Sequence, residues 1–446
     1  MIECKIINNE GVMMKRVTLI IFCLMSTVLL MAQAWNLDSC VAYAQRQNYD
    51  IMRARISLLN SKLSERSARV SMTPSINAGV SENFAFGLAE GANNVKESRS
   101  QSSTGFNASV SMPVFTGLRI TNQIKRTALD VQSAIADIET IKDNVELNVI
   151  GYYLQALYQK EMIRLSQSQC DMAKDLVEKT RKLVEEGVKS ESELYEAIAQ
   201  QAQYEQQLIQ NQSNYKLAIL DLCQLINYHD VENFSIVPLD INAVKEDKLL
   251  PHPESLFLQT KDSRPNIISQ RKKIESAEIA IKEAQADYYP QLSLNASWGT
   301  GYYHIFNANN PAFGKQFVNN GSEVVGFSLS IPIYNRMQVR HNVQRQKYAL
   351  EEQKISAAEA ENQLFKDIQT AYYNALAAKE KYKAAEANFD SGSKAFEFAQ
   401  SKYDNGKITL YEYNESKFRM QQAEVEMLQS QYEYLLREKI LMFYAQ

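Results

Sequence analysis

The chain has 446 residues, with 48 basic and 52 acidic side chains and a formal net charge of −4. This balance gives no basic footprint for nucleic acid, so we expect no nucleic-acid partner. Glycine (15 residues) and proline (9 residues) are scarce, which favours long helices over a loop-rich fold.

Residues 1–34 have the layout of a secretory signal peptide. Lys15 and Arg16 precede an apolar stretch, Val17–Met31, and Ala32-Gln33-Ala34 follows it. This order of basic, apolar and small residues is typical of a cleaved export signal. A membrane anchor is the alternative, but the apolar stretch is shorter than the ~20 residues that a spanning helix needs. We therefore expect an exported chain.

The residue types that carry chemistry form no catalytic or metal-binding pattern. Past the signal, Cys40, Cys170 and Cys223 cannot all pair within one chain, and their spacing fits no metal site. The four histidines are scattered, and no two have helical ligand spacing. We expect no enzyme activity, no cofactor and no metal.

The first part of the mature chain changes its period from helix to strand. Apolar and small residues recur at helical spacing over 36–72, and Pro74 follows. Apolar residues then alternate with Ser, Asn and Gly at about 75–86 and 105–112. Such alternation predicts two strands, each with one apolar and one polar face. A polar loop joins them.

The longest predicted element comes next. Residues 118–186 contain no proline, and their apolar residues recur every three or four positions, which predicts one continuous helix. Gly187 ends it, as glycines do at helix C-termini. A return helix is expected at 191–226, so the first repeat covers 35–230.

The same order recurs in the second half. Pro113 and Gly187 are 74 positions apart, and Pro332 and Gly406 are also 74 apart. We interpret the prolines as strand–helix junctions and the glycines as helix-ending turns of a duplicated unit. The second repeat, 264–446, is expected to contain an opening helix, strands at about 291–302 and 325–331, a long helix at 337–405 and a return helix at 410–444. A linker with some local structure, 231–263, joins the repeats.

Four two-faced strands in an exported chain suggest part of a membrane β-barrel. The smallest single-chain barrels have about eight strands, and an open edge in lipid leaves backbone groups unsatisfied. The strands must therefore be shared among subunits, and three chains supply twelve.

With these features in place, the chain resembles the TolC-type outer-membrane efflux proteins from Trp35 to Gln446. One departure is Tyr49, where the first copy in the family usually has proline. The segments that carry the resemblance are Arg264-Pro265, Ala284, Tyr289-Pro290-Gln-Leu-Ser-Leu294, Pro113-Val-Phe-Thr-Gly117, Pro332-Ile-Tyr-Asn-Arg336 and the two glycine turns.

The resemblance implies an α+β membrane protein, mainly helical: a homotrimer whose twelve-stranded outer-membrane β-barrel continues into a long periplasmic α-helical barrel. It implies a passive, gated conduit of a tripartite efflux or type I secretion system, in contact with outer-membrane lipid. The implied partners are a periplasmic adaptor (a membrane fusion protein) and an inner-membrane pump or exporter. A periplasmic coiled-coil adaptor or structural spacer without a barrel is the alternative. Nothing in the sequence selects among drugs, metal cations and polypeptides as cargo.

The resemblance also places the periplasmic entrance at the glycine turns Gly187 and Gly406, where an adaptor would dock. Glu193 and Glu412 each lie six positions after a turn glycine, and Glu415 lies nine after the second. In the family, carboxylates after the second turn form rings that narrow the entrance. The patterns Ser190-x-x-Glu193 and Thr409-x-x-Glu412 also match capping boxes, so the capping and pore-lining interpretations stand side by side.

Two further residues at the second turn bear on gating. The prototypes pair a basic residue two positions after the second glycine with an acidic residue after the first turn. Ile408 occupies that position here, so closure is expected to use Lys407 or apolar packing. Tyr403 matches an aromatic residue that forms gating hydrogen bonds in the family.

Overall fold

A computed structural model of the protein describes residues 34–90, 96–98, 100–239 and 250–445. Nearly all of the predicted signal peptide, residues 1–33, lies outside this range. The chain divides into two compact units. The helical unit takes the residues up to Met52, Ile141–Thr260 and the residues from Phe365 onward. The sheet unit takes Arg53–Thr140 and Lys261–Leu364.

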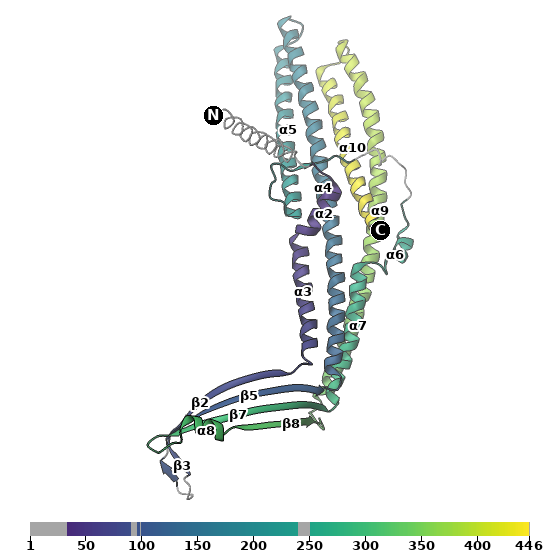
Figure 1. The fold of residues 1–446 in the computed structure, drawn as a ribbon. Coiled ribbons are helices and arrows are strands. Elements are labelled where there is room, and N and C mark those ends of the chain that lie inside the picture. The colour runs from purple at the N-terminus through teal and green to yellow at the C-terminus, as the bar shows by residue number, and fades with distance from the viewer. Residues whose placement is uncertain (1–33, 91–95, 99, 240–249, 446) are drawn as a thin grey trace, which may run out of the picture. The chain divides into compact units, whose positions relative to one another are not determined.

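The sheet unit contains one antiparallel sheet of four strands in the order β2-β5-β7-β8 (Figure 1). Each repeat therefore supplies two neighbouring strands. The helices connect at one end of the sheet, which we call the proximal end, and loops join the strands at the other, distal end. The strands are β2 (Ser75–Ala85), β5 (Gln101–Phe115), β7 (Gln291–Ile305) and β8 (Ser322–Ser330).

Three strands differ from their predicted bounds. The predicted strand at 105–112 is too short at both ends, because Gln101–Thr104 pairs with both neighbours although it lacks apolar alternation. β7 runs to Ile305, past the expected 302, and β8 begins at Ser322 and stops before Ile331. Cross-strand hydrogen bonding sets these ends, and it leaves no trace in a hydropathy pattern.

The loops at the distal end hold elements that the sequence did not predict. A small hairpin, β3 (Leu88–Glu90) with β4 (Lys96–Ser98), lies between β2 and β5. A short helix, α8 (Phe313–Asn319), lies between β7 and β8.

Two very long helices follow the strand pairs. α4 (Arg119–Glu185) and α9 (Gln338–Asp404) have 67 residues each, and each begins in the sheet unit and ends in the helical unit. Their return helices, α5 (Glu191–Ile226) and α10 (Leu410–Ala445), have 36 residues each.

The predicted single helix at 36–72 is wrong, because Asn48 divides it. α2 (Leu37–Gln47) ends and α3 (Tyr49–Val70) begins on either side of this residue, whose backbone is extended. The Asn48 side chain accepts a hydrogen bond from the Asp50 amide at 2.8 Å and donates one to the Leu225 carbonyl at 2.9 Å. Asparagine competes with the helix for backbone groups in this way.

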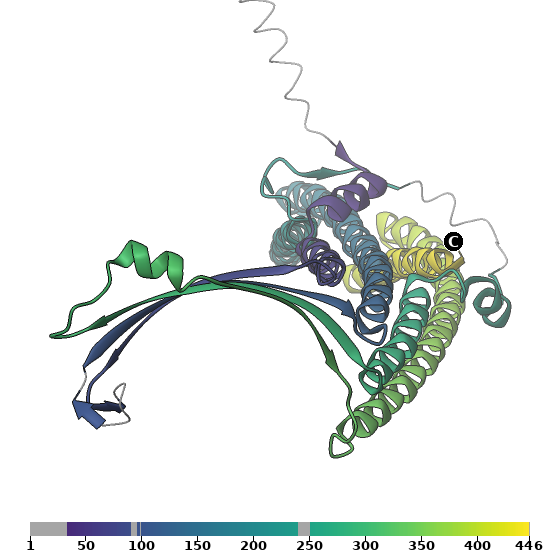
Figure 2. The same ribbon diagram turned by 60° about the horizontal axis from the view of Figure 1, so that its bottom comes forward.

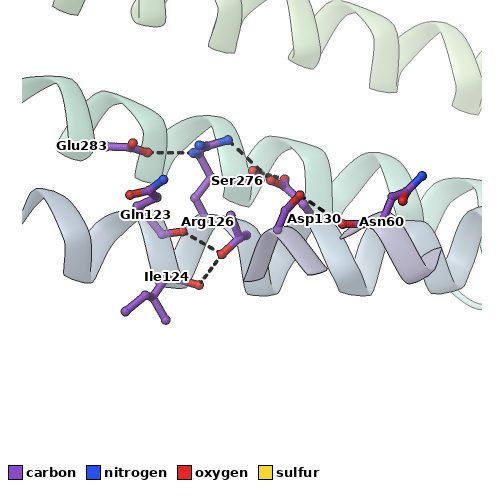
Figure 3. Close-up of polar contacts among 9 residues, drawn as sticks. Asn60, Gln123, Ile124, Arg126, Asp130, Ser276 and Glu283 are labelled. Carbon is purple, nitrogen blue, oxygen red and sulfur yellow. Dashed lines mark hydrogen bonds and ion pairs between the residues drawn. The ribbon is translucent and has the colours of Figure 1, made fainter. Parts of the chain in front are cut away.

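The helix of the second repeat, α7 (Pro265–Gln285), packs on α4 through polar contacts (Figure 3). Arg126 pairs with Glu283 at 2.7 Å, and the Ser276 hydroxyl donates to Asp130 at 2.5 Å. Hydrogen bonds further along the same two helices join Ser133 to Ser269 and Ser269 to Asp137. Paired polar groups at set spacings fix the register of these helices, because a slip leaves buried groups unpaired.

The core of the helical unit lies among α2, α4, α5, α9 and α10. Tyr153 is fully buried there, and its hydroxyl donates to the carbonyls of Trp35 and Val237 at 3.0 and 2.6 Å. These bonds hold β1 (Ala34–Trp35), which pairs in parallel with β6 (Ser235–Ile236), against the long helix. The linker, residues 231–263, thus contains β6 and α6 (Pro253–Thr260).

Within the described ranges, no helix is both long and apolar enough to cross a bilayer.

Candidate functional site: the sheet faces and the helical turns

The sheet carries two chemically distinct faces. Directly paired residues such as Val80 and Phe106, or Leu294 and Phe327, point to the same side. The apolar face carries Ile76, Ala78, Val80, Phe84, Phe106, Ala108, Val110, Met112, Leu292, Leu294, Ala296, Trp298, Val325, Phe327 and Leu329, and Glu82, Thr104 and Glu323 lie on the same side toward the distal end. The other face carries Asn77, Gly79, Ser81, Ser103, Gly105, Asn107, Ser109, Ser111, Ser293, Asn295, Ser297, Gly299, Gly326 and Ser328, with Val324 as an apolar exception.

The apolar face is largely uncovered. Ile76, Val325 and Phe327 are 76%, 74% and 71% exposed. A sheet in water would bury such a face, so these side chains require another apolar medium or partner.

The two sheet edges, β2 and β8, have one neighbour each. Hydrogen bonds between β7 and the loop that contains α8 show which β8 residues direct their backbone groups to the open edge. Backbone groups of Tyr303 and Ile305, on the side of β7 toward β8, bond to Gln316 and Asn310. In an antiparallel pair, alternate residues bond to the same neighbour. Even-numbered β8 residues therefore bond to β7, while odd-numbered ones, including Val325, direct their amides and carbonyls to the open edge.

The junctions after Pro113 and Pro332 repeat one unusual backbone. Gly117 and Leu118 have φ of 62° and 69°, and Arg336 and Met337 have φ of 53° and 62°. Pro113 lies inside β5, two residues before its end, whereas Pro332 lies beyond β8. A Cβ on Gly117 would approach the Ala286 carbonyl oxygen at 2.4 Å. This glycine therefore permits the first junction to pack against the second repeat.

The two long helices end in the same hydrogen-bond pattern. Gly187 donates to Val184 O at 3.0 Å, and Val188 donates to Leu183 O at 2.8 Å. In the second turn, the Gly406 amide donates to the carbonyl three residues earlier at 3.0 Å, and the Lys407 amide donates to the carbonyl five residues earlier at 2.8 Å. Both glycines have positive φ, 75° and 66°. These are Schellman motifs, in which a left-handed residue ends the helix.

The return helices begin with hydroxyl caps, but the two glutamates behave differently. Glu412 closes a full capping box: its carboxylate accepts from the Thr409 amide at 2.8 Å and from the Thr409 hydroxyl at 3.0 Å. The bond from the backbone amide, with help from the hydroxyl, lowers the pKa of Glu412.

Glu193 makes only half of the predicted box. Its amide donates to the Ser190 hydroxyl at 3.4 Å, but its carboxylate turns to Lys189, with the ammonium at 3.1 Å. This ion pair is partly shielded, because the two side chains are 18% and 32% exposed.

Lys189 also joins the two turns. Its ammonium donates to the Tyr403 hydroxyl and lies 4.3 Å from the centre of the Tyr403 ring. Burial alone lowers the pKa of Lys189, but the hydrogen bond to Tyr403 and the pair with Glu193 raise it overall. The lysine therefore stays charged at neutral pH, as a cation held between one hairpin and the other.

Further contacts surround this link. Tyr403 stacks on Tyr413 with ring centres 4.7 Å apart. Lys179 pairs with Asp404 at 2.9 Å, in an exposed position. Deeper between α5 and α10, the Tyr204 hydroxyl donates to Gln421 at 2.6 Å.

The remaining predicted site residues lie apart from this link. Glu415 pairs with Arg419 one turn further along α10, so a cation accompanies its charge. Lys407 is exposed, and the part of the chain that the structure describes gives its side chain no ion pair. The sequence leaves closure to Lys407 or to apolar packing; in this structure the polar contact between the turns is made by Lys189.

No role for Lys189 was predicted from the sequence, because basic residues were considered only after the second turn glycine. Lys189 lies two positions after Gly187, and Ile408 lies two positions after Gly406. The basic residue is thus present at the equivalent position of the other repeat. Superposing the two repeats would have found it. No cluster of three or more possible metal ligands occurs among the residues with described positions.

Comparisons with known proteins agree with this architecture. The sequence model of a family described as "Outer membrane efflux protein" matches residues 41–228 and 256–445. The chain is 21% identical over 404 residues to "Toxin and drug export protein A" of Aggregatibacter actinomycetemcomitans, covering 90% of this chain and 84% of that protein. It is also 21% identical over 418 residues to "Outer membrane protein TolC" of Escherichia coli K12, covering 92% and 81%.

Solved structures share the fold. The Campylobacter jejuni CmeC outer membrane channel superposes with a TM-score of 0.76 at 18% identity, covering 92% of this chain and 85% of that chain. CusC superposes with a TM-score of 0.75 at 15% identity, covering 92% and 91%. With a family match over both repeats and channel structures of the same fold, the chain belongs to the outer membrane efflux protein family.

Proposed function

We propose that three copies of this chain form the outer-membrane channel of a tripartite efflux or type I secretion system. The observation that carries this proposal is the sheet, with its exposed apolar face, its Ser/Asn/Gly face and its two open edges. TolC-type channels work with periplasmic adaptors and inner-membrane pumps, and the relatives found for this chain carry efflux and export names.

Closure of the sheet requires more than one copy. Lipid offers no hydrogen bonds to the free groups of β2 and β8, so each edge must pair. If β8 of one copy pairs with β2 of the next, three copies give a twelve-stranded barrel. The apolar face then contacts lipid, and the polar face lines a lumen that is wide enough for water.

The helical turns form the periplasmic entrance in this proposal. Lys189, Tyr403 and Glu193 hold the two hairpins of one chain together near the tips, which narrows the opening. Glu415, with Arg419, and Glu412 lie on the second hairpin and contribute acidic groups near the same opening. The exposed turns at Gly187 and Gly406 are the surface that we assign to the adaptor.

The channel performs no bond-making step in this account. Its residues provide a conduit and a gate, while the inner-membrane partner supplies energy and selects the cargo. The rival function, a coiled-coil adaptor without a barrel, leaves the four-stranded sheet and its exposed apolar face without a purpose.

The oligomeric state in the membrane tests the proposal. We expect the protein in outer-membrane fractions, as a complex with three times the mass of the mature chain by light scattering with the detergent contribution subtracted. The complex should resist sodium dodecyl sulfate until it is heated. A folded monomer in the soluble periplasmic fraction would instead support the adaptor.

A further inference from the structure

One buried stripe of α10 carries polar residues where apolar ones are expected. Buried side chains recur every three or four residues along this helix, as on a face that packs against a neighbour. Leu410, Tyr413 and Leu428 supply apolar and aromatic groups to the stripe. Between them, Lys417 and Gln421 are only 4% and 6% exposed. Because lysine is almost never fully buried unless it is paired, this position requires a physical explanation.

The two polar side chains lie where the second hairpin meets the first. α5 forms the first hairpin with α4 (blue to teal), and α10 forms the second with α9 (green to yellow) (Figure 2). The Tyr204 hydroxyl on α5 donates to the side-chain oxygen of Gln421 at 2.6 Å. The Lys417 ammonium lies 5.4 Å from the centre of the same Tyr204 ring. Separation of the hairpins therefore breaks both contacts.

These contacts leave both polar groups incompletely satisfied. Lys417 has no ion pair with a carboxylate among the described residues, and burial lowers its pKa. The aromatic ring replaces only part of the hydration that the ammonium loses. The amide nitrogen of Gln421 is buried and has no hydrogen-bond partner in the part of the chain that the structure describes. Both groups therefore oppose the contact between the hairpins, because water satisfies them when the hairpins separate.

The contact nearer the turns acts in the opposite direction. There the Lys189 ammonium lies 3.1 Å from the Glu193 carboxylate and donates to the Tyr403 hydroxyl. Tyr403 in turn stacks on Tyr413, which precedes Lys417 by one turn of α10. The interface between the hairpins thus holds a satisfied cation at the turns and an unsatisfied one further along α10.

We propose that Lys417 and Gln421 bias the gate toward opening, against the closing contact of Lys189. This role rests on the proposed channel and its gate. When the hairpins separate, the Lys417 ammonium and the Gln421 amide gain water, and this gain offsets part of the loss of the Lys189 contact. The closed arrangement is then only marginally preferred. A partner that binds the exposed turns more tightly in the open arrangement needs only a small difference in affinity to open the channel.

The test is single-channel conductance of the purified complex in planar bilayers at pH 7. The quantity measured is the fraction of time spent in the widest conductance step, in wild type and in a Lys189→Met background. Lys417→Met keeps the length of the side chain and removes its charge, so this fraction should fall by about tenfold or more. Lys417→Arg keeps the charge and should leave the fraction at the parent value or above. Lys439→Met, exposed on the same helix, is the matched control and should not change it.

A counter-charge at position 421 gives an independent check. Gln421→Glu places a carboxylate four residues after Lys417, a spacing at which side chains on a helix meet. The new carboxylate also keeps an acceptor for the Tyr204 hydroxyl. We expect this variant to close the channel as Lys417→Met does, because the ammonium is then paired. Combining the two substitutions leaves a buried carboxylate unpaired, so the widest step should return. A role of Lys417 in packing alone predicts no such reversal.

An unchanged fraction for Lys417→Met in both backgrounds would overturn the proposal, as would equal closure by Lys439→Met. Closure that adds up in the combined variant would also overturn it, because the effect would then not depend on an unpaired charge. All complexes should keep the same mass in light scattering, so that a lower fraction reports gating rather than lost assembly. An absence of conductance from folded wild-type protein would refute the channel itself, a failure distinct from conducting variants with unaltered gating.

Discussion

At the scale of single residues, one local motif gives two outcomes. Both return helices begin with a hydroxyl residue followed three positions later by glutamate. Glu193 has Lys189 four residues before it, just outside the helix that begins at Glu191, and the Lys189 ammonium lies 3.1 Å from its carboxylate. Glu412 has Ile408 at that position, so its carboxylate turns back to Thr409. The motif predicts the caps, but the residue four positions earlier decides where the carboxylate points.

The sequence therefore indicated where the turns lie but not which side chains meet across them. Glycine punctuation and spacing are local signals, and they identify both turns. The contact between Lys189 and Tyr403 joins residues 214 positions apart, and it depends on how the hairpins pack. No local pattern contains that information.

Lys417 gives a prediction at this scale. It is 4% exposed on α10, and its ammonium lies 5.4 Å from the Tyr204 ring centre. Burial lowers its pKa below the ordinary 10.5, so the charged form opposes folding at neutral pH. Lys417→Met keeps the length of the side chain and removes the charge. We expect a higher midpoint of thermal unfolding by circular dichroism at pH 7.

The pH dependence of this effect follows from the lowered pKa. Between the folded and unfolded pKa values the unfolded chain binds more protons, so wild type gains stability as pH rises through the folded pKa. The advantage of Lys417→Met should therefore shrink toward pH 10. An advantage that grows with pH would show that the lysine charge is stabilising in place.

At the scale of elements, apolar periodicity indicated helices and strands but not their interruptions. The break at Asn48 arises from side-chain hydrogen bonds. α8 is held in place because Gln316 in the helix and Asn310 in the loop before it bond to the end of β7. Both depend on specific polar contacts, which hydropathy cannot predict. The extra residues of β5 are likewise held by ladder bonds rather than by side-chain pattern.

The turn glycines give an element-scale prediction with a control of opposite sign. Gly187 and Gly406 have positive φ, so replacing either with alanine should destabilise the fold by about 1–2 kcal/mol. Gly151 lies inside α4, and a Cβ there meets nothing within 4 Å. Gly151→Ala should stabilise by about 0.5–1 kcal/mol. Thermal midpoints of the three variants test this, and the same sign at all three positions would argue against it.

At the scale of the whole molecule, the duplication was the most informative signal. It pairs the strands two by two, and the structure joins β5 of the first repeat to β7 of the second in one sheet. The mainly helical α+β fold and the family followed from these repeated markers. The sequence of one chain gives no direct view of the assembly, because the partners of β2 and β8 lie in other copies in our account.

The open edge of β8 can be tested with paired proline substitutions. Val325→Pro removes an amide that faces the free edge, so the sheet within one chain should survive while assembly fails. Val324→Pro removes an amide that bonds to β7, so it should disrupt the chain's own sheet. Light scattering reports assembly, and circular dichroism reports strand content. Normal assembly of Val325→Pro would refute pairing through this edge.

The most direct measurement of the central claim is single-channel conductance in planar bilayers. We predict small steps for wild type and larger ones for Lys189→Met, because that substitution removes the shielded contact between the hairpins. Lys179→Met should conduct as wild type does, since its ion pair is exposed and contributes little. An absence of conductance from folded wild-type protein would contradict the channel, and equal steps from wild type and Lys189→Met would contradict the gate.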